Sequence, residues 1–420
     1  MRENKFYSEL FETISEIRVV DTHEHLLPES MRIEGGADFF GVVMTHYASS
    51  DLISAGMSAD DMEKLRGKDI PFEEKIKIFI PFWERASNTT YCRALEIAAR
   101  DLYGADEINA GTLPEINRAM KEKCKPGFYK EILQDRCKIK YCLWDQFFYE
   151  LPEKDDFLRL SLRLDDFVFV NGPEDIINLE KRFDTTISCP ECLEELMEKR
   201  ITEHKPRGLT ALKSALAYSR TLDYRQVSHA EAVLSMERML RGRFLESDAK
   251  NVQDFMMYSL AQKAFWHDLT LQMHTGLLEG NGNMIRNANP ALLSQLVSAN
   301  PGTRFDLFHG GYPYGGELAS MAKMFPNVYL DMAWLHIISP SYAVCYTREW
   351  LETVPVCKLL GFGGDYLFVE GTYGHFQIAK ENLAAALSEQ VEAGAFGMRE
   401  AKRYASMMLR ENPEALFGNA

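Results

Sequence analysis

Short apolar runs that alternate with segments of helical periodicity constrain the fold of this 420-residue chain more than any other feature. Strands separated by helices are typical of a parallel sheet, because each crossover helix returns the chain to the same edge. Eight such units predict a (β/α)8 TIM barrel. The expected strands are residues 18–22, 139–144, 167–171, 209–212, 269–274, 304–309, 328–331 and 359–363.

The spacing of the strands is uneven, because a long stretch rich in Glu, Lys, Leu and Met separates the first two. Long excursions after a barrel strand lie on the catalytic face. We therefore expect residues 40–135 to form a helical insertion, a lid, within a single barrel domain of residues 1–420. A separate helical domain without contact to the site is the alternative. Helical patterns within the insertion span residues 58–66, 72–86, 90–102 and 113–123.

Charge and composition narrow the choice of partners. The net charge of −15 argues against nucleic acid and anionic membranes. No run approaches the ~18 apolar residues of a membrane helix, and the charged N-terminus does not resemble a signal peptide. We expect a cytoplasmic protein with a small-molecule substrate and reduced thiols; homo-oligomerisation stays open. The Cys189–Cys192 pair lacks the second pair that a zinc ribbon needs.

The segment Asp21-Thr22-His23-Glu24-His25 closes the first expected strand. Side chains at i and i+2 of a strand point to the same face. His23 and His25 are therefore placed to bind one metal ion.

Further candidate ligands follow later strands: Lys213, His274, His309 and Asp365. The carboxyl ends of barrel strands converge on one mouth, so these residues should meet there. Imidazole and carboxylate ligands make zinc the first candidate metal, and manganese, iron, nickel and cobalt are the alternatives. Asp365 is placed to take a proton from an activated water. Three roles are considered for His309: ligand of a second metal, catalytic base, or hydrogen-bond donor to the substrate. Each residue alone has an ordinary structural explanation, but their coincidence at five strand ends favours a metal site.

Several polar and aromatic residues near the mouth are candidates for substrate binding. Arginine is the usual clamp for a carboxylate, although packing or a surface ion pair is the alternative for each residue. The candidates are Tyr218, Arg220, Glu279, Arg286, Tyr312, Trp334 and His375. Histidines away from strand ends are expected to be structural, namely His46, His204, His229, His267 and His336.

As an ordered set, these motifs resemble the amidohydrolase superfamily over essentially the whole chain. The resemblance implies a distorted barrel with one or two divalent metals. It implies that His23, His25, His274 and Asp365 are ligands, with Asp365 also a proton shuttle. His309 would bind a second metal or polarise the substrate. Lys213 falls where binuclear members carry a carboxylated lysine that bridges two metals; unmodified, it would present a positive charge to an acidic substrate.

Within the superfamily, different segments of the chain resemble two different subfamilies. Residues 212–220, 273–278 and 308–314 resemble the amidohydrolase-2 group, including the domain fused to glutamine synthetase in some fungi and plants. The motif at residues 23–29 and the segment at 373–376 are similar to uronate isomerase, which also carries a helical insertion after strand one. Uronate isomerase typically lacks the strand-six histidine and has an Arg-rich segment where this chain reads Gln-Ile-Ala-Lys.

The resemblance implies a metal-dependent hydrolase that activates water to attack a carbonyl-type centre of a small, acidic substrate. A uronate-type aldose/ketose isomerase is the leading alternative, and a metal-dependent decarboxylase is another. A non-catalytic barrel is disfavoured because every expected ligand is intact.

Overall fold

The computed structural model describes residues 5–145 and 157–418. Its centre is an eight-stranded sheet in which each strand pairs in parallel with the next in sequence order. The strands are β1 (Val19–Glu24), β2 (Ile139–Trp144), β3 (Leu158–Arg163), β4 (Leu209–Ser214), β5 (Thr270–Met273), β6 (Arg304–Leu307), β7 (Val328–Asp331) and β8 (Leu359–Leu360).

The sheet closes on itself where the chain beyond β8 meets β1. Thr22 N–H donates to the Phe362 carbonyl at 3.1 Å, and Asp365 N–H donates to the His23 carbonyl at 2.8 Å. The predicted (β/α)8 barrel is therefore confirmed. The second of these bonds also brings Asp365 beside the two histidines of β1.

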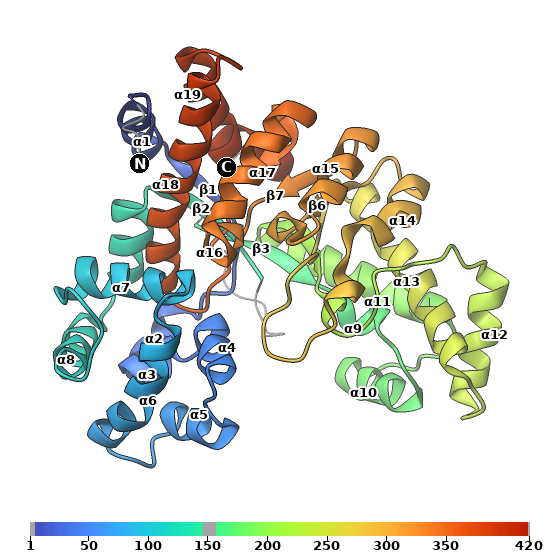
Figure 1. The fold of residues 1–420 in the computed structure, drawn as a ribbon. Coiled ribbons are helices and arrows are strands. Elements are labelled where there is room, and N and C mark those ends of the chain that lie inside the picture. The colour runs from blue at the N-terminus through green and yellow to red at the C-terminus, as the bar shows by residue number, and fades with distance from the viewer. Residues whose placement is uncertain (1–4, 146–156, 419–420) are drawn as a thin grey trace.

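Helices surround the barrel, and Figure 1 shows α1 and α19 at the opposite end from α4, α5 and α6. Among the described residues, no helix is both long and apolar enough to cross a membrane. The helices outside the insertion are α1 (Tyr7–Glu16), α9 (Asp165–Val168), α10 (Pro173–Phe183), α11 (Pro190–His204), α12 (His229–Leu240), α13 (Glu246–Trp266), α14 (Ser294–Ala299), α15 (Gly315–Met324), α16 (Leu335–Ile338), α17 (Pro340–Thr353), α18 (Val369–Glu392), α19 (Met398–Ser406) and α20 (Asn412–Phe417).

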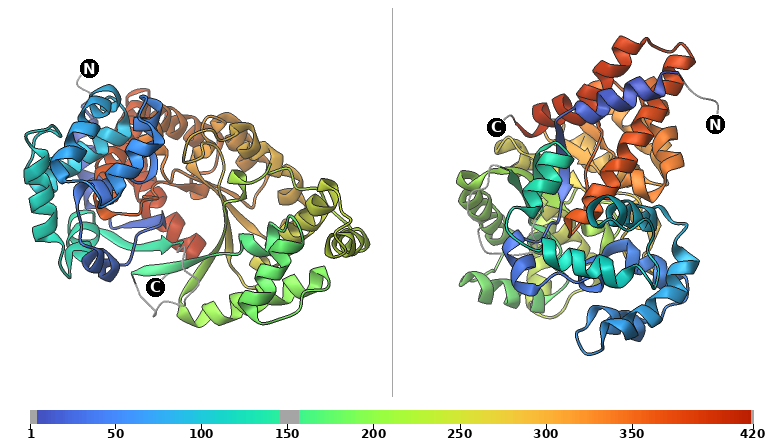
Figure 2. Two further views of the ribbon diagram at one scale, coloured as in Figure 1. Left: turned by 90° about the horizontal axis from the view of Figure 1, so that it is seen from below. Right: turned by 90° about the vertical axis from the view of Figure 1, so that its left-hand side faces the viewer.

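The segment between β1 and β2 is helical throughout most of its length, and its α7 packs along α18 (Figure 2). A buried ion pair joins it to the barrel helices, because Arg32 donates to both carboxylate oxygens of Glu370 at 2.9 and 2.5 Å. Its elements are α2 (Glu29–Gly35), α3 (Phe39–Val43), α4 (His46–Ser54), α5 (Ala59–Arg66), α6 (Phe72–Ala86), α7 (Thr90–Tyr103), α8 (Leu113–Lys123) and a π-helical turn (Lys130–Arg136).

The third strand lies earlier than the sequence predicted. Residues 167–171 were expected to form it, but they continue from α9, where Phe167 and Val168 are buried against other helices. The actual β3 alternates Leu158, Leu160 and Leu162 with polar residues, the two-residue period of a strand. The apolar run at the end of α9 and just after it has the composition of a buried strand. The correction matters because Arg163 ends β3 and points to the barrel mouth.

The amino end of the barrel is closed by apolar side chains. Leu416 and Phe417 of α20 pack against side chains of four strands, and the Leu416 carbonyl accepts from Thr270 Oγ1 at 3.2 Å. The C-terminal helix therefore seals the end opposite the candidate ligands. The strand residues of this cluster are Val20, Tyr141, Leu143, Ala211 and Leu360.

Candidate metal centre

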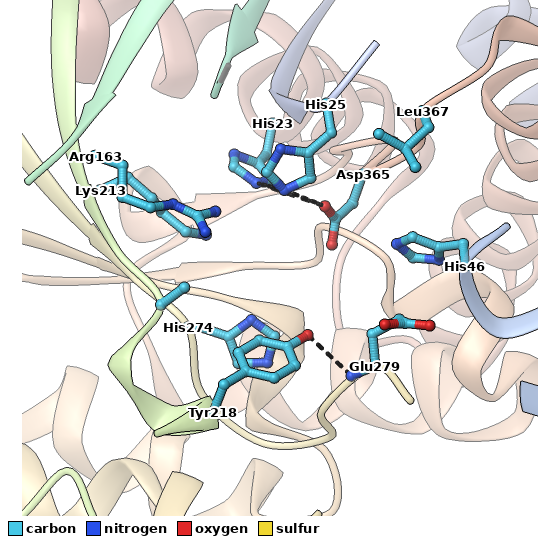
Figure 3. A pocket seen from close by; sticks show the side chains of 11 residues that line it. His23, His25, His46, Arg163, Lys213, Tyr218, His274, Glu279, Asp365 and Leu367 are labelled. Atoms are coloured by element: carbon cyan, nitrogen blue, oxygen red, sulfur yellow. Dashed lines mark hydrogen bonds and ion pairs between the residues drawn. The ribbon is translucent and has the colours of Figure 1, made fainter. Parts of the chain in front are cut away.

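The first pair of facing imidazoles comes from the carboxyl end of β1. His23 Nε2 and His25 Nε2 lie 3.2 Å apart. Asp365 Oδ1 lies 3.5 Å from the first nitrogen and 3.3 Å from the second (Figure 3). All three side chains are nearly or fully buried, so the pair and the carboxylate form one compact set of donors.

The second pair consists of His274 after β5 and His309 after β6. His274 Nδ1 and His309 Nε2 lie 3.0 Å apart. The other nitrogen of each ring faces a backbone carbonyl, that of Leu277 at 2.8 Å and that of Ala333 at 3.0 Å. A carbonyl only accepts, so those nitrogens carry the hydrogens of the neutral rings. The two facing nitrogens are then both lone pairs, which cannot bond to each other.

A cation between the facing lone pairs removes this conflict. Two nitrogens that each lie about 2.0–2.1 Å from one zinc ion stand about 3 Å apart, as both pairs do here. His25 follows the same rule, because its Nδ1 faces the Asp145 carbonyl at 2.8 Å and leaves Nε2 as the lone pair. The donor chemistry therefore fits divalent metal ions.

The protonation states favour metal binding as well. Burial lowers the pKa of His23, His274 and His309 well below the usual value, and it lowers that of His25. The positive charge of Lys213 adds to this effect for the first three. The imidazoles are therefore neutral at pH 7, the form that binds metal.

Lys213 comes from the end of β4 and is fully buried. Its Nζ lies 3.6 Å from the centre of the Phe308 ring, and burial lowers its pKa to about 8. Lys213 lines the same cavity as His23, His25 and His274, and its charge lowers the pKa of histidines in both pairs.

Two further charged residues belong to the site and were missed by the sequence analysis. Donor atoms of Asp145, His23 and His25 all lie within 4.8 Å of one another. The Asp145 carboxylate also accepts from Arg163 Nε at 3.1 Å, so Asp365 is the freer third ligand. Asp145 directly follows β2 and the strand-end rule could have found it, whereas Arg163 was hidden by the misplaced third strand.

A cavity of about 280 Å³ lies at the mouth, and His23, His25, His274 and Asp365 line it, whereas His309 and Asp145 are not among its lining residues. Arg163 and Lys213 form one wall and Glu279 and His46 lie across from them (Figure 3). Of the predicted substrate-binding residues, Tyr218 and Glu279 lie on the wall, and the Tyr218 hydroxyl accepts from the Glu279 N–H at 2.9 Å. The full lining is His23, His25, His46, Arg163, Lys213, Ala215, Tyr218, His274, Glu279, Asp365 and Leu367.

His46 was expected to be structural, but it lines the cavity from the start of α4. Burial lowers its pKa to about 4. The insertion therefore contributes a side chain to the site. Its position depends on how α4 packs against the barrel, which the local sequence does not reveal.

Three other candidates do not reach the cavity wall. Arg220 is held by Asp254 at 2.6 Å and by Gln253 at 2.8 Å, so its guanidinium is used within the structure. Arg286 is exposed on a short 3-10 turn. His375 is buried on α18, where its Nδ1 donates to the Gly364 carbonyl at 3.1 Å.

Left-handed φ values occur at four residues around the centre, His46 (60°), His309 (63°), Trp334 (68°) and Asp365 (58°). Among the described residues they occur at three other non-glycine positions, Lys138, Asp184 and Asp268. Side chains other than glycine adopt this region at a cost, and such residues gather at functional sites. The fold therefore holds two of the candidate ligands in conformations that it must enforce.

A (β/α)8 barrel with a histidine–carboxylate centre at its mouth is the class that the fold and site define. Residues 226–418 match the family Amidohydro_2, described as amidohydrolase. Over 148 residues the chain is 31% identical to the protein fluG of Emericella nidulans; this stretch is 35% of the chain and spans only 17% of that relative.

Similarity over nearly the whole chain is to uronate isomerases and to a putative metal-dependent hydrolase from Lactobacillus casei, whose crystal structure superposes with a TM-score of 0.69 at 18% identity and covers 97% of both chains. The chain is 23% identical over 406 residues to a uronate isomerase of Nostoc punctiforme, covering 85% of this chain and 83% of the relative. The crystal structure of a glucuronate isomerase from Caulobacter crescentus superposes with a TM-score of 0.79 at 17% identity, covering 99% and 96% of the two chains. These comparisons confirm the predicted resemblance to the amidohydrolase superfamily with uronate isomerase features.

Proposed function

We propose that this protein is a metal-dependent hydrolase with a two-metal centre. The observation that carries the proposal is the presence of two imidazole pairs, each with facing nitrogens 3.0–3.2 Å apart, in which His25, His274 and His309 turn lone pairs inward. Asp365 lies near both pairs, since its Oδ2 is 3.9 Å from His309 Nε2. One ion alone would leave one of the two pairs unused.

In this proposal, His23, His25 and Asp365 hold one ion, and His274 and His309 hold the other. Zinc is the first candidate, because neutral imidazole and carboxylate suit it. Divalent ions at such centres supply Lewis acidity and a nucleophile at neutral pH. As a carbamate, Lys213 would supply anionic oxygen ligands to the ions. Its amine has a pKa of about 8, so about one tenth of it is neutral at pH 7 and can add to CO2, forming the N–C bond and losing a proton.

The chain's own side chains then position the substrate and move the proton. Asp365 accepts the proton of the attacking water and returns it to the leaving group. Arg163 lies on the cavity wall and offers a charge to an acidic substrate, since its guanidinium is suited to carboxylates. Tyr218 and His46 close the remaining sides and limit the size of what can enter.

A uronate-type isomerase is the second candidate, supported by the similarity over nearly the whole chain. In that case the His23–His25 pair and Asp365 would hold one ion and a sugar acid. His309 weighs against it, because that histidine is typically missing from uronate isomerases. The sequence Gln377-Ile-Ala-Lys380 also lacks the arginines expected there.

The two candidates differ in whether water is consumed. The zinc- or manganese-loaded protein should be assayed with a panel of N-acyl amino acids and lactones in ¹⁸O-labelled water, and in parallel with aldo- and keto-uronates. The proposal expects label in a released acid and no change in the uronates. Aldose–ketose conversion without label would overturn it in favour of the isomerase, and release of CO2 would indicate a decarboxylase.

Two variants sharpen this assay. Lys213→Met removes the carbamate and should lower hydrolysis by about 10³-fold, because the ions lose its oxygen ligands. Arg286→Ala removes an exposed cation that lies off the cavity and serves as the matched control, with unchanged activity. Equal activity of the two variants would contradict the role of Lys213.

A further inference from the structure

Cys189 and Cys192 form a second candidate site that neither the cavity nor the barrel mouth uses. Cys189 is the residue before α11, and Cys192 lies in the first turn of that helix. Their Sγ atoms lie 3.3 Å apart, and both side chains are partly exposed. Pro190 at the first helical position fixes the turn between them. The chain therefore presents a preformed pair of thiols to solvent.

The surroundings of Cys192 favour a thiolate. Its Sγ lies within reach of two donors, the Cys189 thiol and the Ser188 hydroxyl at 3.9 Å. A position in the first turn of a helix also stabilises negative charge. Burial raises the pKa of Cys192, but hydrogen bonds from Ser188 and Cys189 outweigh burial and lower it below the usual value. Burial together with the Glu191 carboxylate raises the pKa of Cys189 to about 11.

The other cysteines lack these features. Cys92, Cys137 and Cys142 are buried, and Cys345 and Cys357 are exposed. Cys124 is partly exposed, but its thiol donates to the Arg32 carbonyl at 3.5 Å. Within residues 5–145 and 157–418, only the Cys189–Cys192 pair brings two sulfur atoms into contact. In the same part of the chain, no third His, Cys, Asp or Glu completes a metal-binding group with them. A pair of sulfurs without further ligands is suited to disulfide chemistry rather than to zinc.

We propose that Cys189 and Cys192 are a redox-active dithiol that forms a reversible disulfide by exchange with low-molecular-weight disulfides such as glutathione disulfide. In the first step the Cys192 thiolate attacks one sulfur of the small disulfide. A mixed disulfide forms and one small thiolate leaves. In the second step Cys189 loses its proton and attacks the Cys192 sulfur, which releases the second small thiol. The protein loses two hydrogens, and one small disulfide becomes two thiols.

The geometry requires little movement for the second step. The sulfurs must approach from 3.3 Å to a bond of about 2.05 Å. Rotation of the two partly exposed side chains can supply this, because Cys189 precedes the helix and is free of its backbone constraints. The cross-link would join the loop before α11 to the first turn of that helix. The same turn is tied to the start of α12 by the Glu191–His229 ion pair.

Mass spectrometry of the full-length protein tests the proposal. The reduced protein is equilibrated with mixtures of glutathione and glutathione disulfide, quenched with iodoacetamide and analysed intact and as peptides. We expect residues 189–192 to lose both alkylation sites together and to carry an internal disulfide that dithiothreitol reverses. Full alkylation of both cysteines under oxidising mixtures, or a glutathione adduct as the end product, would overturn the proposal.

Three single variants separate the two steps. Cys189→Ser should trap a glutathione adduct on Cys192, whereas Cys192→Ser should react about tenfold more slowly because the favoured thiolate is gone. Cys345→Ser removes an exposed thiol without a sulfur neighbour and should leave the internal disulfide unchanged. An equal rate for the two partner variants would contradict the assignment of Cys192 as nucleophile. If a variant fails to fold, the wild-type measurement alone still decides whether the disulfide forms.

Discussion

The two ends of the barrel are built in opposite ways. At the amino end, Leu416 and Phe417 pack against apolar strand residues, and the hydroxyls of Thr270 and Tyr141 are hydrogen-bonded. At the mouth, His274 and His309 face each other with lone pairs, and among the described residues His23 Nδ1, His46 Nδ1 and Trp334 Nε1 have no hydrogen-bond partner. Left-handed φ values occur at His309 and Asp365 of the mouth, and also at Lys138 and Asp268, which precede β2 and β5.

This difference indicates which end provides stability and which provides function. Burial of apolar surface stabilises the amino end without any ligand. Lone-pair conflict, strain and unpaired polar atoms destabilise the mouth of the metal-free protein, and bound ions would offset that cost. Changes at the mouth should therefore alter metal binding more than folding, and changes at the amino end should do the reverse.

The largest effect is expected for His274→Ala. This substitution removes one nitrogen of the second pair, so activity should fall by about 10³-fold, equivalent to about 4 kcal/mol. The metal-free variant should be as stable as the wild type or more so, because the facing lone pairs are gone. Chelator competition and thermal unfolding of the metal-free proteins measure both quantities. His267→Ala, at a surface ion pair with Glu198, is the control. If His274→Ala lost much of its stability but kept its metal affinity, the mouth would contribute to folding rather than to metal binding, contrary to the comparison of the two ends.

Phe417→Ala tests the opposite end. Truncation of this buried ring should lower the free energy of unfolding by about 3 kcal/mol, because it leaves a cavity among the strand side chains. Metal content and activity below the unfolding transition should be unchanged. Urea denaturation together with elemental analysis checks this prediction. Loss of metal from a folded variant would show that the two ends are coupled.

Asp145→Asn probes a residue beside the ligands. The carboxylate pairs with Arg163, and the backbone carbonyl of the same residue orients His25. Weakening such a partner should lower metal affinity by about 10–100-fold with little change in folding. Titration of the metal-free protein with zinc measures the effect. An unchanged affinity would mean that the backbone carbonyl alone orients His25.

The smallest effect concerns pH. The pKa of His46 is about 4 in the folded protein, below the ~6.5 of an unfolded chain. The unfolded state therefore binds more protons between these values, so stability is present above pH 6.5 and falls as the pH drops. Between pH 6.5 and 5.5, His46 should account for about 1 kcal/mol of lost stability. Urea unfolding of the metal-free wild type and of His46→Gln should show a shallower pH dependence in the variant; parallel curves would contradict the assignment.

The sequence predicted those site residues whose positions follow from neighbouring sequence, and it missed those whose positions depend on tertiary packing. His23, His25, His274, His309 and Asp365 lie at the carboxyl ends of strands or within five residues after them, so the strand pattern and barrel geometry were sufficient to group them. Arg163 was missed because the apolar run at the end of α9 has the composition of a strand. His46 was missed because its position depends on packing of the insertion.

Arg220 illustrates the opposite error. It was predicted to clamp a substrate, but it pairs with Asp254 on α13, a partner 34 residues away that no local pattern indicates. Partner choice among distant charged residues is a property of the tertiary structure. The sequence alone could not distinguish a structural arginine from one that lines the cavity.

The central claim is that two imidazole pairs hold two ions, with Lys213 as a carbamate ligand. Elemental analysis combined with native mass spectrometry tests it most directly, on protein loaded with zinc in bicarbonate buffer. We predict about two equivalents of zinc and the added mass of one CO2 on the wild type, with both lost in Lys213→Met. One equivalent or less in the wild type, without added mass and unchanged by the substitution, would contradict the claim.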